Sequence, residues 1–294
     1  MKLGYPCLNW TLPGNAGKTF RLKSYSEAKL IETVDNNLSC LQQILQYNKE
    51  HGFYFFRISS ETIPFASHEI CQFNWQKHYA SQLNDIGKFI QKNDMRISMH
   101  PDQFVLINAL DKKIVNKSIK ELIWHCELLD LMNLKQDAKV QIHVGGIYDD
   151  KKASMQRFVD NYKKLPELIK KRLVIENDDR LYSLRDCLEI HEQTTIPIIF
   201  DNFHHECLNN DEPVADAIQL AQATWSKKDG ILMTDYSSQQ PGERVGKHRE
   251  SIDIKHFEKY IMATQNYDFD IMLEIKDKEK SAEKALKILG VYSK

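Results

Sequence analysis

Residues 172–201 read RLVIENDDRLYSLRDCLEIHEQTTIPIIFD, and this stretch predicts the fold of the whole chain. It holds two short apolar runs, residues 173–176 and 197–201, whose Ile, Val, Leu and Phe are typical of strands buried on both faces. A segment near residues 183–192 lies between them and has the 3.6-residue rhythm of an amphipathic helix. The runs end on Glu176 and Asp201. The stretch is therefore a strand–helix–strand unit of a parallel sheet, with a carboxylate at the end of each strand.

The same unit recurs on both sides of this stretch. Further strands are predicted at residues 3–8, 53–58, 96–100, 139–143, 230–235 and 270–275. Residues 9–29 are predicted to form a loop, and further helices are predicted at residues 34–51, 75–91, 114–133, 153–170, 214–225, 252–264 and 281–289. Eight such units predict an α/β fold, a single-domain TIM (β/α)8 barrel over residues 1–294.

Composition limits the kind of protein this is. A hydrophobic content of 42% and a charged content of 28% are ordinary for a soluble globular chain. No apolar stretch approaches the roughly 18 residues of a membrane span, and the six cysteines are scattered as in a reduced, cytoplasmic protein. The net charge of −1 gives no global support for nucleic-acid binding, so a DNA-binding surface would have to be local.

Metal-capable side chains recur at the carboxyl ends of the predicted strands. Six of them end strands, and three more lie in loops just after strands: His100, His143, Glu176, Asp201, Asp235 and Glu274, then His68, His204 and His248. Any one such histidine is more often structural, and a strand-end Asp is commonly a helix N-cap. Because the carboxyl ends of barrel strands meet at one mouth, nine groups at that rim predict a site for several metal ions.

Mixed nitrogen and oxygen ligands without a thiolate favour Mn²⁺, with Zn²⁺, Fe²⁺ or Mg²⁺ as alternatives. Two or three such ions, about 3.5–4 Å apart, would clamp a phosphodiester, which favours hydrolytic phosphoryl transfer. We expect a metal-bound hydroxide to attack phosphorus and Glu176 to be the most important catalytic group. Lys276, just after Glu274, is expected to support the developing charge.

Nine motifs add a more specific observation. They are LGYPCLN (residues 3–9), RISS (57–60), PFASH (64–68), MHPDQFV (99–105), QIHVGG (141–146), VIENDD (174–179), FDNFHH (200–205), SSQQPGERVGKH (237–248) and MLEIKDKE (272–279). In these motifs the chain resembles the UV damage endonuclease family over nearly its full length. The resemblance implies a TIM barrel with a cluster of divalent metals, typically manganese. It also implies nicking of DNA immediately 5′ to cyclobutane pyrimidine dimers and 6-4 photoproducts.

The resemblance also implies roles for individual residues. Gln103 and Phe104 would be the pair that probes the duplex where damaged bases are pushed out, although many relatives carry Tyr at the second position. Tyr5 and Asn9 would lie at the mouth of the barrel near the scissile phosphate. The metal ligands implied by the motifs are His68, His100, His143, Glu176, Asp201, His204, His248 and Glu274.

One segment departs from the family pattern. Many relatives read Lys-x-His-x-Ser at the seventh strand, where the lysine can be carboxylated and the histidine binds metal. Here the positions are Met233, Asp235 and Ser237. We expect Asp235 to supply an oxygen ligand in place of the imidazole nitrogen, with altered affinity at one metal site.

Basic residues in the predicted rim loops are candidates for phosphate contacts, although each one alone is more often a solvated charge. The strongest candidates are Arg180, Arg244 and Lys247, and the others are Lys18, Arg21, Lys23 and Arg249. The expected partner is double-stranded DNA carrying UV lesions, bound by a monomer that acts at the nucleoid and makes no contact with a membrane.

Two other enzyme classes use similar barrels. A Mn²⁺-dependent sugar isomerase or epimerase would need a closed pocket and fewer metals, and fold analogy alone does not separate it from a nuclease. An apurinic/apyrimidinic endonuclease with three zinc ions would be distinguished by nicking of abasic DNA. A metal- or DNA-binding barrel without activity is the non-catalytic alternative, and manganese-dependent turnover would exclude it.

Overall fold

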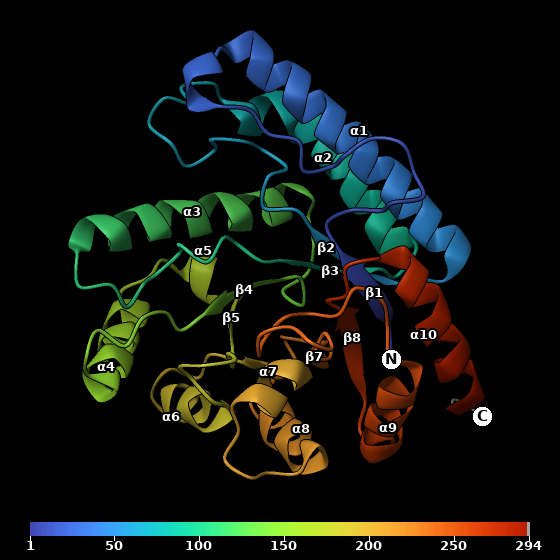
Figure 1. The fold of residues 1–294 in the computed structure, drawn as a ribbon. Coiled ribbons are helices and arrows are strands. Elements are labelled where there is room, and N and C mark those ends of the chain that lie inside the picture. Colours follow the sequence, from blue (N-terminus) through green and yellow to red (C-terminus); the bar gives the residue numbers. More distant parts are fainter. Residues whose placement is uncertain (293–294) are drawn as a thin grey trace.

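Eight parallel strands form a closed barrel in the computed structural model, which describes residues 1–292 (Figure 1). Each strand pairs with the next along the chain, and β8 pairs with β1 to close the ring. The predicted TIM barrel is confirmed. The strands are β1 (Leu3–Pro6), β2 (Phe55–Ile58), β3 (Arg96–Met99), β4 (Lys139–His143), β5 (Leu173–Glu176), β6 (Ile198–Asp201), β7 (Leu232–Tyr236) and β8 (Phe269–Leu273).

Helices surround the barrel on its outside (Figure 1). They are η1 (Leu22–Ser24), α1 (Glu27–His51), α2 (Trp75–Lys92), α3 (Lys112–Leu131), α4 (Lys151–Lys163), α5 (Glu167–Lys170), α6 (Leu184–Thr194), α7 (Asn202–Cys207), α8 (Val214–Gln222), α9 (Ile254–Thr264) and α10 (Glu279–Tyr292). Within residues 1–292, no helix combines the length and the apolar character that crossing a membrane requires.

Several elements differ from the predictions: the short helix α7 was not predicted, and β8 ends at Leu273, before Glu274. Three other differences have a clear local reason. Helix α1 begins at Glu27 rather than at residue 34, because the Ser26 side chain accepts the Lys29 N–H and caps the helix. The helix predicted over residues 153–170 is divided into α4 and α5 at Pro166, which has no N–H to continue the helix. The first strand ends at Pro6, since the next residue has a positive φ of 70°.

The barrel interior is layered by the alternation of side chains along each strand. A buried apolar cluster fills one layer: Phe55, Val174, Ile199, Met233 and Met272. The residue two positions further along each of these five segments is charged: Arg57, Glu176, Asp201, Asp235 and Glu274. The period of two therefore places an apolar floor directly beneath a layer of ionisable groups at the carboxyl ends of the strands.

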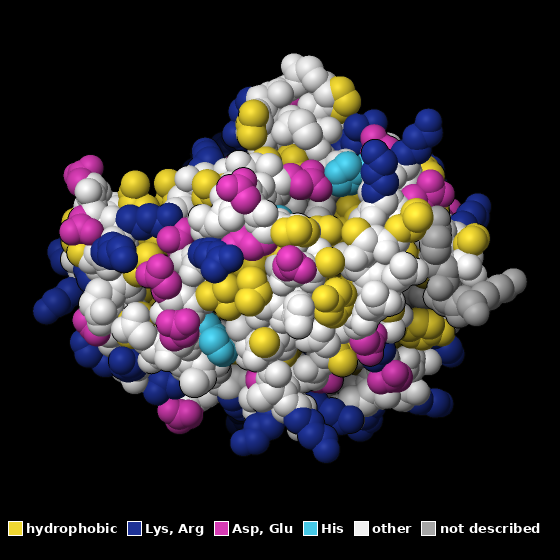
Figure 2. Space-filling view, turned by 90° about the horizontal axis from the view of Figure 1, so that it is seen from below, with side chains coloured by type: hydrophobic (Ala, Val, Ile, Leu, Met, Phe, Trp, Pro, Cys, Tyr) yellow, Lys and Arg dark blue, Asp and Glu magenta, His cyan; other side chains and the backbone are white. Residues whose placement is uncertain are grey.

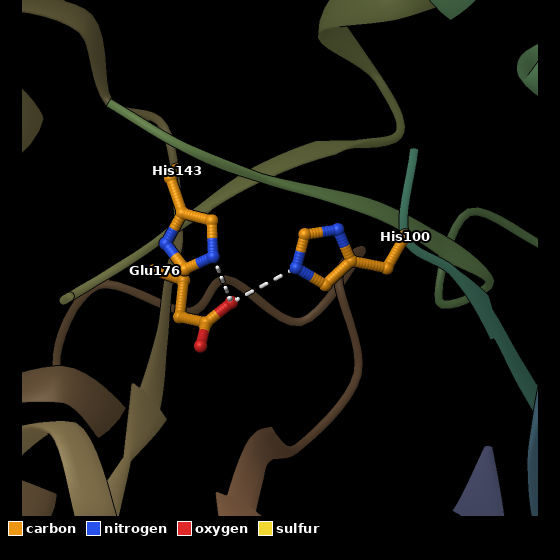
Figure 3. A group of neighbouring side chains, drawn as sticks. All are labelled: His100, His143 and Glu176. Carbon is orange, nitrogen blue, oxygen red and sulfur yellow. Dashed lines mark ion pairs between the residues drawn. The ribbon is translucent and has the colours of Figure 1, made fainter. Parts of the chain in front are cut away.

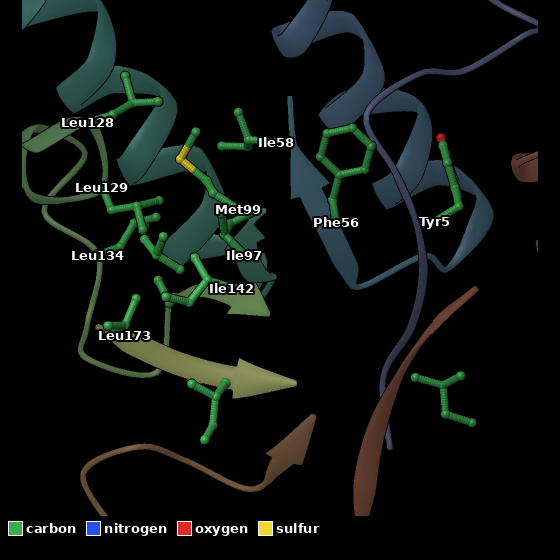
Figure 4. Packing of buried hydrophobic residues seen from close by; sticks show 14 of the residues in the cluster. Tyr5, Phe56, Ile58, Ile97, Met99, Leu128, Leu129, Leu134, Ile142 and Leu173 are labelled. Carbon is green, nitrogen blue, oxygen red and sulfur yellow. The ribbon is translucent and has the colours of Figure 1, made fainter. Parts of the chain in front are cut away.

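Two further layers complete the core. Between barrel and helices, apolar side chains such as Phe56, Ile97 and Leu128 pack in one continuous cluster (Figure 4). On the other side of the apolar floor, buried ion pairs join Arg96 to Asp270 at 2.8 Å and Lys139 to Asp229 at 2.5 Å. The six cysteines are all free thiols. On the face that Figure 2 shows, acidic and basic side chains are interspersed, in keeping with the near-zero net charge.

Candidate metal centre

Glu176 is the centre of the site, and imidazoles from three other segments surround it. It is the last residue of β5, His143 is the last of β4, and His100 directly follows β3 (Figure 3). Glu176 Oε2 lies 3.4 Å from His100 Nε2 and 3.8 Å from His143 Nε2. Its other oxygen lies 3.0 Å from His204 Nδ1. The residues form two groups that could each hold a metal ion, and both include Glu176: His100, His143 and Glu176, and Glu176, Asp201 and His204.

Asp201 has two tasks at the end of β6. Its Oδ1 accepts the backbone N–H of His204 at 2.6 Å and so caps the short helix α7. This cap turns the chain so that the His204 ring returns to within 3.6 Å of Asp201 Oδ2. Asp201 can thus be both a helix N-cap and a metal ligand, because Oδ1 caps the helix and Oδ2 is left for a metal ion.

The donor set fits a divalent cation. Asp201 Oδ2 and His143 Nδ1 are buried and have no hydrogen-bond partner within residues 1–292. A buried polar atom without a partner is costly, and a cation would satisfy the carboxylate oxygen. Imidazole and carboxylate ligands without a thiol suit Mn²⁺, Zn²⁺ or Fe²⁺.

The electrostatics of the cluster are those of a site that attracts cations. Burial by itself would raise the pKa of Glu176, but His143, His100 and His204 lower it well below its usual value. Burial raises the pKa of Asp201 well above its usual value. Burial opposes protonation of His204, yet Asp201 and Glu176 outweigh it and raise the His204 pKa to about 11.

His248 and Glu274 flank this centre on one side. The His248 ring lies 5.8 Å from that of His204, and its Nδ1 lies 3.7 Å from Glu274 Oε2. Both residues line a cavity of about 330 Å³ that also contains His100, Arg57 and Lys276. The exposed Lys276 is therefore beside the cluster, and its supporting role stays a prediction.

Arg57 is the main group that the sequence reasoning missed. Its side chain is only 3% exposed, and it points into the interior from β2, where it contacts Glu274, Asp235 and Gln141. The signal was present, because Arg57 interrupts the apolar run FYFFRI two positions after the inward-facing Phe55. A charge at an inward position of a barrel strand predicts a partner at the mouth.

Asp235 belongs to neither of the two metal-capable groups, and its predicted role as a metal ligand stays a prediction. Both its oxygens accept hydrogen bonds from Arg57 Nη2, at 2.7 and 2.8 Å. Burial raises the pKa of Asp235 to about 7, although Arg57 acts in the opposite direction. The sequence indicated a free carboxylate here because the partner lies on a distant strand. Met233, two residues earlier, is part of the apolar floor.

Tyr5 and Asn9 are not exposed at the mouth. Tyr5 is fully buried between β2 and α1, and its hydroxyl donates to Asn48 Oδ1 (Figure 4). Asn9 Nδ2 donates to the Tyr5 hydroxyl, while Asn9 Oδ1 accepts the N–H groups of Thr11 and Leu12. Both side chains thus fix the loop after β1, and their role near the scissile phosphate stays a prediction.

The candidate probing residues do protrude from the molecule. Phe104 is 73% exposed on the loop after β3, with Gln103 exposed beside it. A cavity of about 510 Å³ beside Phe104 is lined by apolar residues such as Val105 and Ile114. His68 also lines this cavity and belongs to neither of the two metal-capable groups, and its Nδ1 accepts the Ile70 N–H at 3.0 Å. Its role as a ligand stays a prediction.

The candidate phosphate-binding residues are accessible to solvent, but some of them form ion pairs with acidic side chains. Arg180 is 72% exposed and lies 3.2 Å from Asp179, while Lys247 lies 3.8 Å from Glu243. Arg244 is exposed. The remaining candidates are Lys18, Arg21 and Lys23, which are exposed, and Arg249, which pairs with Asp253 at 3.3 Å.

The fold and the site define a TIM-barrel protein with a candidate divalent-metal centre at the carboxyl ends of its strands. Comparison with known proteins gives the family. The profile described as UV-endonuclease UvdE matches residues 1–293, and the chain belongs to this family.

Three relatives illustrate the similarity. The UV DNA damage endonuclease of Clostridium perfringens is 40% identical, over 100% of this chain and 72% of its own length. That of Bacillus cereus is 32% identical, over 87% of this chain and 82% of its own. The crystal structure of SacUVDE superposes with a TM-score of 0.96 at 46% identity, over 100% of this chain and 99% of that one. A D-tagatose 3-epimerase-like protein, with a TM-score of 0.60 at 16% identity, shares the fold alone.

Proposed function

We propose that this chain is a divalent-metal-dependent DNA repair endonuclease that nicks the backbone immediately 5′ to UV photolesions. Membership of the UV-endonuclease family supports action on UV-damaged DNA. The observation that carries the metal dependence is the pair of metal-capable groups sharing Glu176. Cyclobutane pyrimidine dimers and 6-4 photoproducts are the proposed substrates, together with other distorting lesions. The cytoplasmic location and action at the nucleoid stay predictions.

The proposed ligands fall into two sets. Glu176 would bridge, His100 and His143 would complete one side, and Asp201 and His204 the other. Two or three ions, Mn²⁺ first, would supply a hydroxide nucleophile at neutral pH and neutralise the phosphoryl oxygens. His248 and Glu274 flank the groups and are proposed as further ligands.

The protein's own groups have separate tasks in this proposal. Lys276 lines the cavity next to Glu274, where its ammonium would stabilise charge that develops on the phosphoryl group. Asp201 holds the His204 backbone through its capping oxygen, so the imidazole stays in place without a metal. Gln141 donates to Glu176 Oε2 at 2.5 Å and fixes the orientation of this carboxylate, which would hold the ions.

Lesion recognition is proposed to use shape rather than base sequence. The exposed Phe104 ring and the Gln103 amide would fill the gap left when damaged bases leave the stack. The apolar cavity beside Phe104 offers a surface for extruded bases. A photodimer is already poorly paired, so its extrusion costs less than that of intact bases. Arg180, Arg244 and Lys247 would bind the flanking phosphates.

One assay tests this proposal. A UV-irradiated, end-labelled duplex is incubated with the protein and Mn²⁺, with and without a chelator, beside a non-irradiated duplex and an abasic duplex. We expect a single nick 5′ to each dimer, loss of the nick with chelator, and no product with Glu176→Gln. Nicking of the abasic duplex in preference to the irradiated one would favour an apurinic/apyrimidinic endonuclease instead. Nicking that persists in the chelator would contradict metal dependence.

A further inference from the structure

An exposed tryptophan lies on the loop after β1, at the carboxyl ends of the strands. Trp10 is 57% exposed, whereas the other three tryptophans of the chain belong to the interior. Trp75 and Trp124 are buried, and Trp225 packs against the apolar floor of the barrel. A single exposed apolar side chain is common on protein surfaces, so the surroundings of Trp10 decide what it can do.

The protein holds this exposed indole in place. Trp10 Nε1 donates to the Lys276 carbonyl at 3.1 Å, and the Trp10 backbone N–H donates to Glu279 Oε2 at 3.0 Å. The hydroxyl of the next residue, Thr11, donates to the other oxygen of Glu279 at 2.9 Å. A side chain that is fixed before binding loses little conformational entropy when it meets a ligand. Trp10 is therefore both accessible and preorganised.

Two ammonium groups lie beside the indole. Lys276, whose carbonyl accepts the Trp10 N–H, is exposed, and Lys278 is half-buried. Both line the cavity of about 330 Å³ that also contains Glu274 and His100. Within residues 1–292, neither ammonium forms an ion pair or a hydrogen bond. Unpaired cations next to an aromatic ring are the combination with which proteins bind a nucleic-acid strand, because the cations attract phosphates and the ring stacks on a base.

The cavity also relates Trp10 to the exposed ring of Phe104. Its wall includes Lys276, to which Trp10 is bonded, and Pro101, which begins the loop that carries Phe104. A phosphate in this cavity would have a nucleoside on either side, and the two wall segments offer an exposed ring for each. Within an intact duplex the faces of the bases are covered by their neighbours, so a ring can stack only where the duplex is opened.

We propose that the Trp10 indole is a second stacking platform, which takes a nucleobase of the opened DNA strand next to the cavity, while Phe104 fills the gap at the lesion. This inference rests on the proposed function, which makes damaged DNA the occupant of the mouth. Trp10 contributes to binding and takes no part in the chemical step. The occupant is DNA because the ring lies beside two unpaired ammonium groups, which bind phosphates.

Intrinsic tryptophan fluorescence gives a readout that does not depend on nicking. The protein is titrated in chelator with a duplex that carries a single dimer, with the undamaged duplex and with a single strand of the same sequence. We expect the dimer duplex and the single strand to quench the emission of wild type. Trp10→Phe keeps an aromatic ring and removes the fluorophore, so its emission should change much less. An equal change in both proteins would assign the quenching to another tryptophan and overturn the proposal.

Affinities from fluorescence anisotropy separate stacking from a structural role. Trp10→Ala should weaken binding to the dimer duplex and to the single strand by about 5- to 150-fold, and binding to the intact duplex little. Trp10→Phe loses the hydrogen bond to Lys276 but keeps a stacking face, so it should retain most of the affinity. Equal losses in the two variants would show that Trp10 acts through the structure of its loop and would overturn the proposal. Equal weakening on intact duplex would overturn it as well.

The controls keep the inference separate from the proposed function. Met262→Ala removes a side chain that is 54% exposed on the outer helix α9, and it should leave all three affinities unchanged. If Trp10→Ala does not fold, the emission of Trp10→Phe decides alone. The same preparations are then tested for nicking with Mn²⁺. Binding that depends on Trp10 without nicking would refute the proposed function and leave this inference standing. A wild-type protein that binds neither the dimer duplex nor the single strand would refute both.

Discussion

Replacing Phe104 with alanine gives the sharpest test of how the protein would recognise damage. The side chain is 73% exposed, so its removal should leave folding intact, with a change in stability within about 0.5 kcal/mol. Stacking of a base on an aromatic ring contributes about 1–3 kcal/mol. Loss of that contact should therefore weaken binding to a dimer-containing duplex by about 5- to 150-fold.

The assay is fluorescence anisotropy with a labelled duplex carrying a single dimer, in chelator so that nicking does not intervene. An undamaged duplex of the same sequence gives the lesion-independent affinity, which should change little because it depends on phosphate contacts. Leu110→Ala is the matched control, since Leu110 is also an apolar residue and is 63% exposed. Equal weakening on damaged and undamaged DNA, or none on either, would refute a wedge role for Phe104.

Three further outcomes are expected. Even changes to residues that only support a metal ligand lower metal affinity about 10- to 100-fold, so Glu176→Gln should lower the Mn²⁺ affinity by at least this factor. Isothermal titration calorimetry measures the affinity, and an unchanged value would contradict the bridging role. Burial lowers the pKa of His125 to about 3 in the folded protein, whereas the same histidine has a pKa of about 6.5 in the unfolded chain. As the pH drops below about 6.5, the unfolded chain therefore binds a proton that the folded protein does not, and the free energy of unfolding falls. At pH 5 this loss is about 2 kcal/mol, and in urea unfolding the fall in stability between pH 7 and pH 5 should be larger in wild type than in His125→Gln by about this amount; an equal fall in both would contradict it. Arg244→Ala should reduce the slope of log affinity against log salt by about 1 for damaged and undamaged duplexes alike; an unchanged slope would remove Arg244 from the phosphate contacts.

The side chains at the strand ends could be predicted to lie together, because the sequence pattern that places each of them is confined to a few neighbouring residues. A buried parallel strand reads as an apolar run, and the residue that ends it lies at the mouth whatever the rest of the chain does. His100, His143, Glu176 and Asp201 therefore come together as their positions in the sequence predict. The start of α1 and the break at Pro166 were missed because one capping serine or one proline decides each of them.

The roles of Asp235 and Tyr5 could not be predicted in the same way. Each is determined by a partner far along the chain, Arg57 for the carboxylate and Asn48 for the phenol. Sequence motifs identify a side chain but not whether its hydrogen-bonding capacity is already used. Only the three-dimensional arrangement shows that Asp235 accepts hydrogen bonds from Arg57 and that Asp201 Oδ2, within the described residues, accepts none.

The apolar floor has a consequence for how such a barrel can change over generations. This floor is a layer of low dielectric between two sets of charged side chains, and it consists of Phe55, Val174, Ile199, Met233 and Met272. Below it, the pairs of Arg96 with Asp270 and of Lys139 with Asp229 tie the strands together. Substitution of metal-ligand residues above the apolar floor leaves these ion pairs intact. The residues at the carboxyl ends of the strands can therefore change, and with them the reaction, while the barrel itself stays closed.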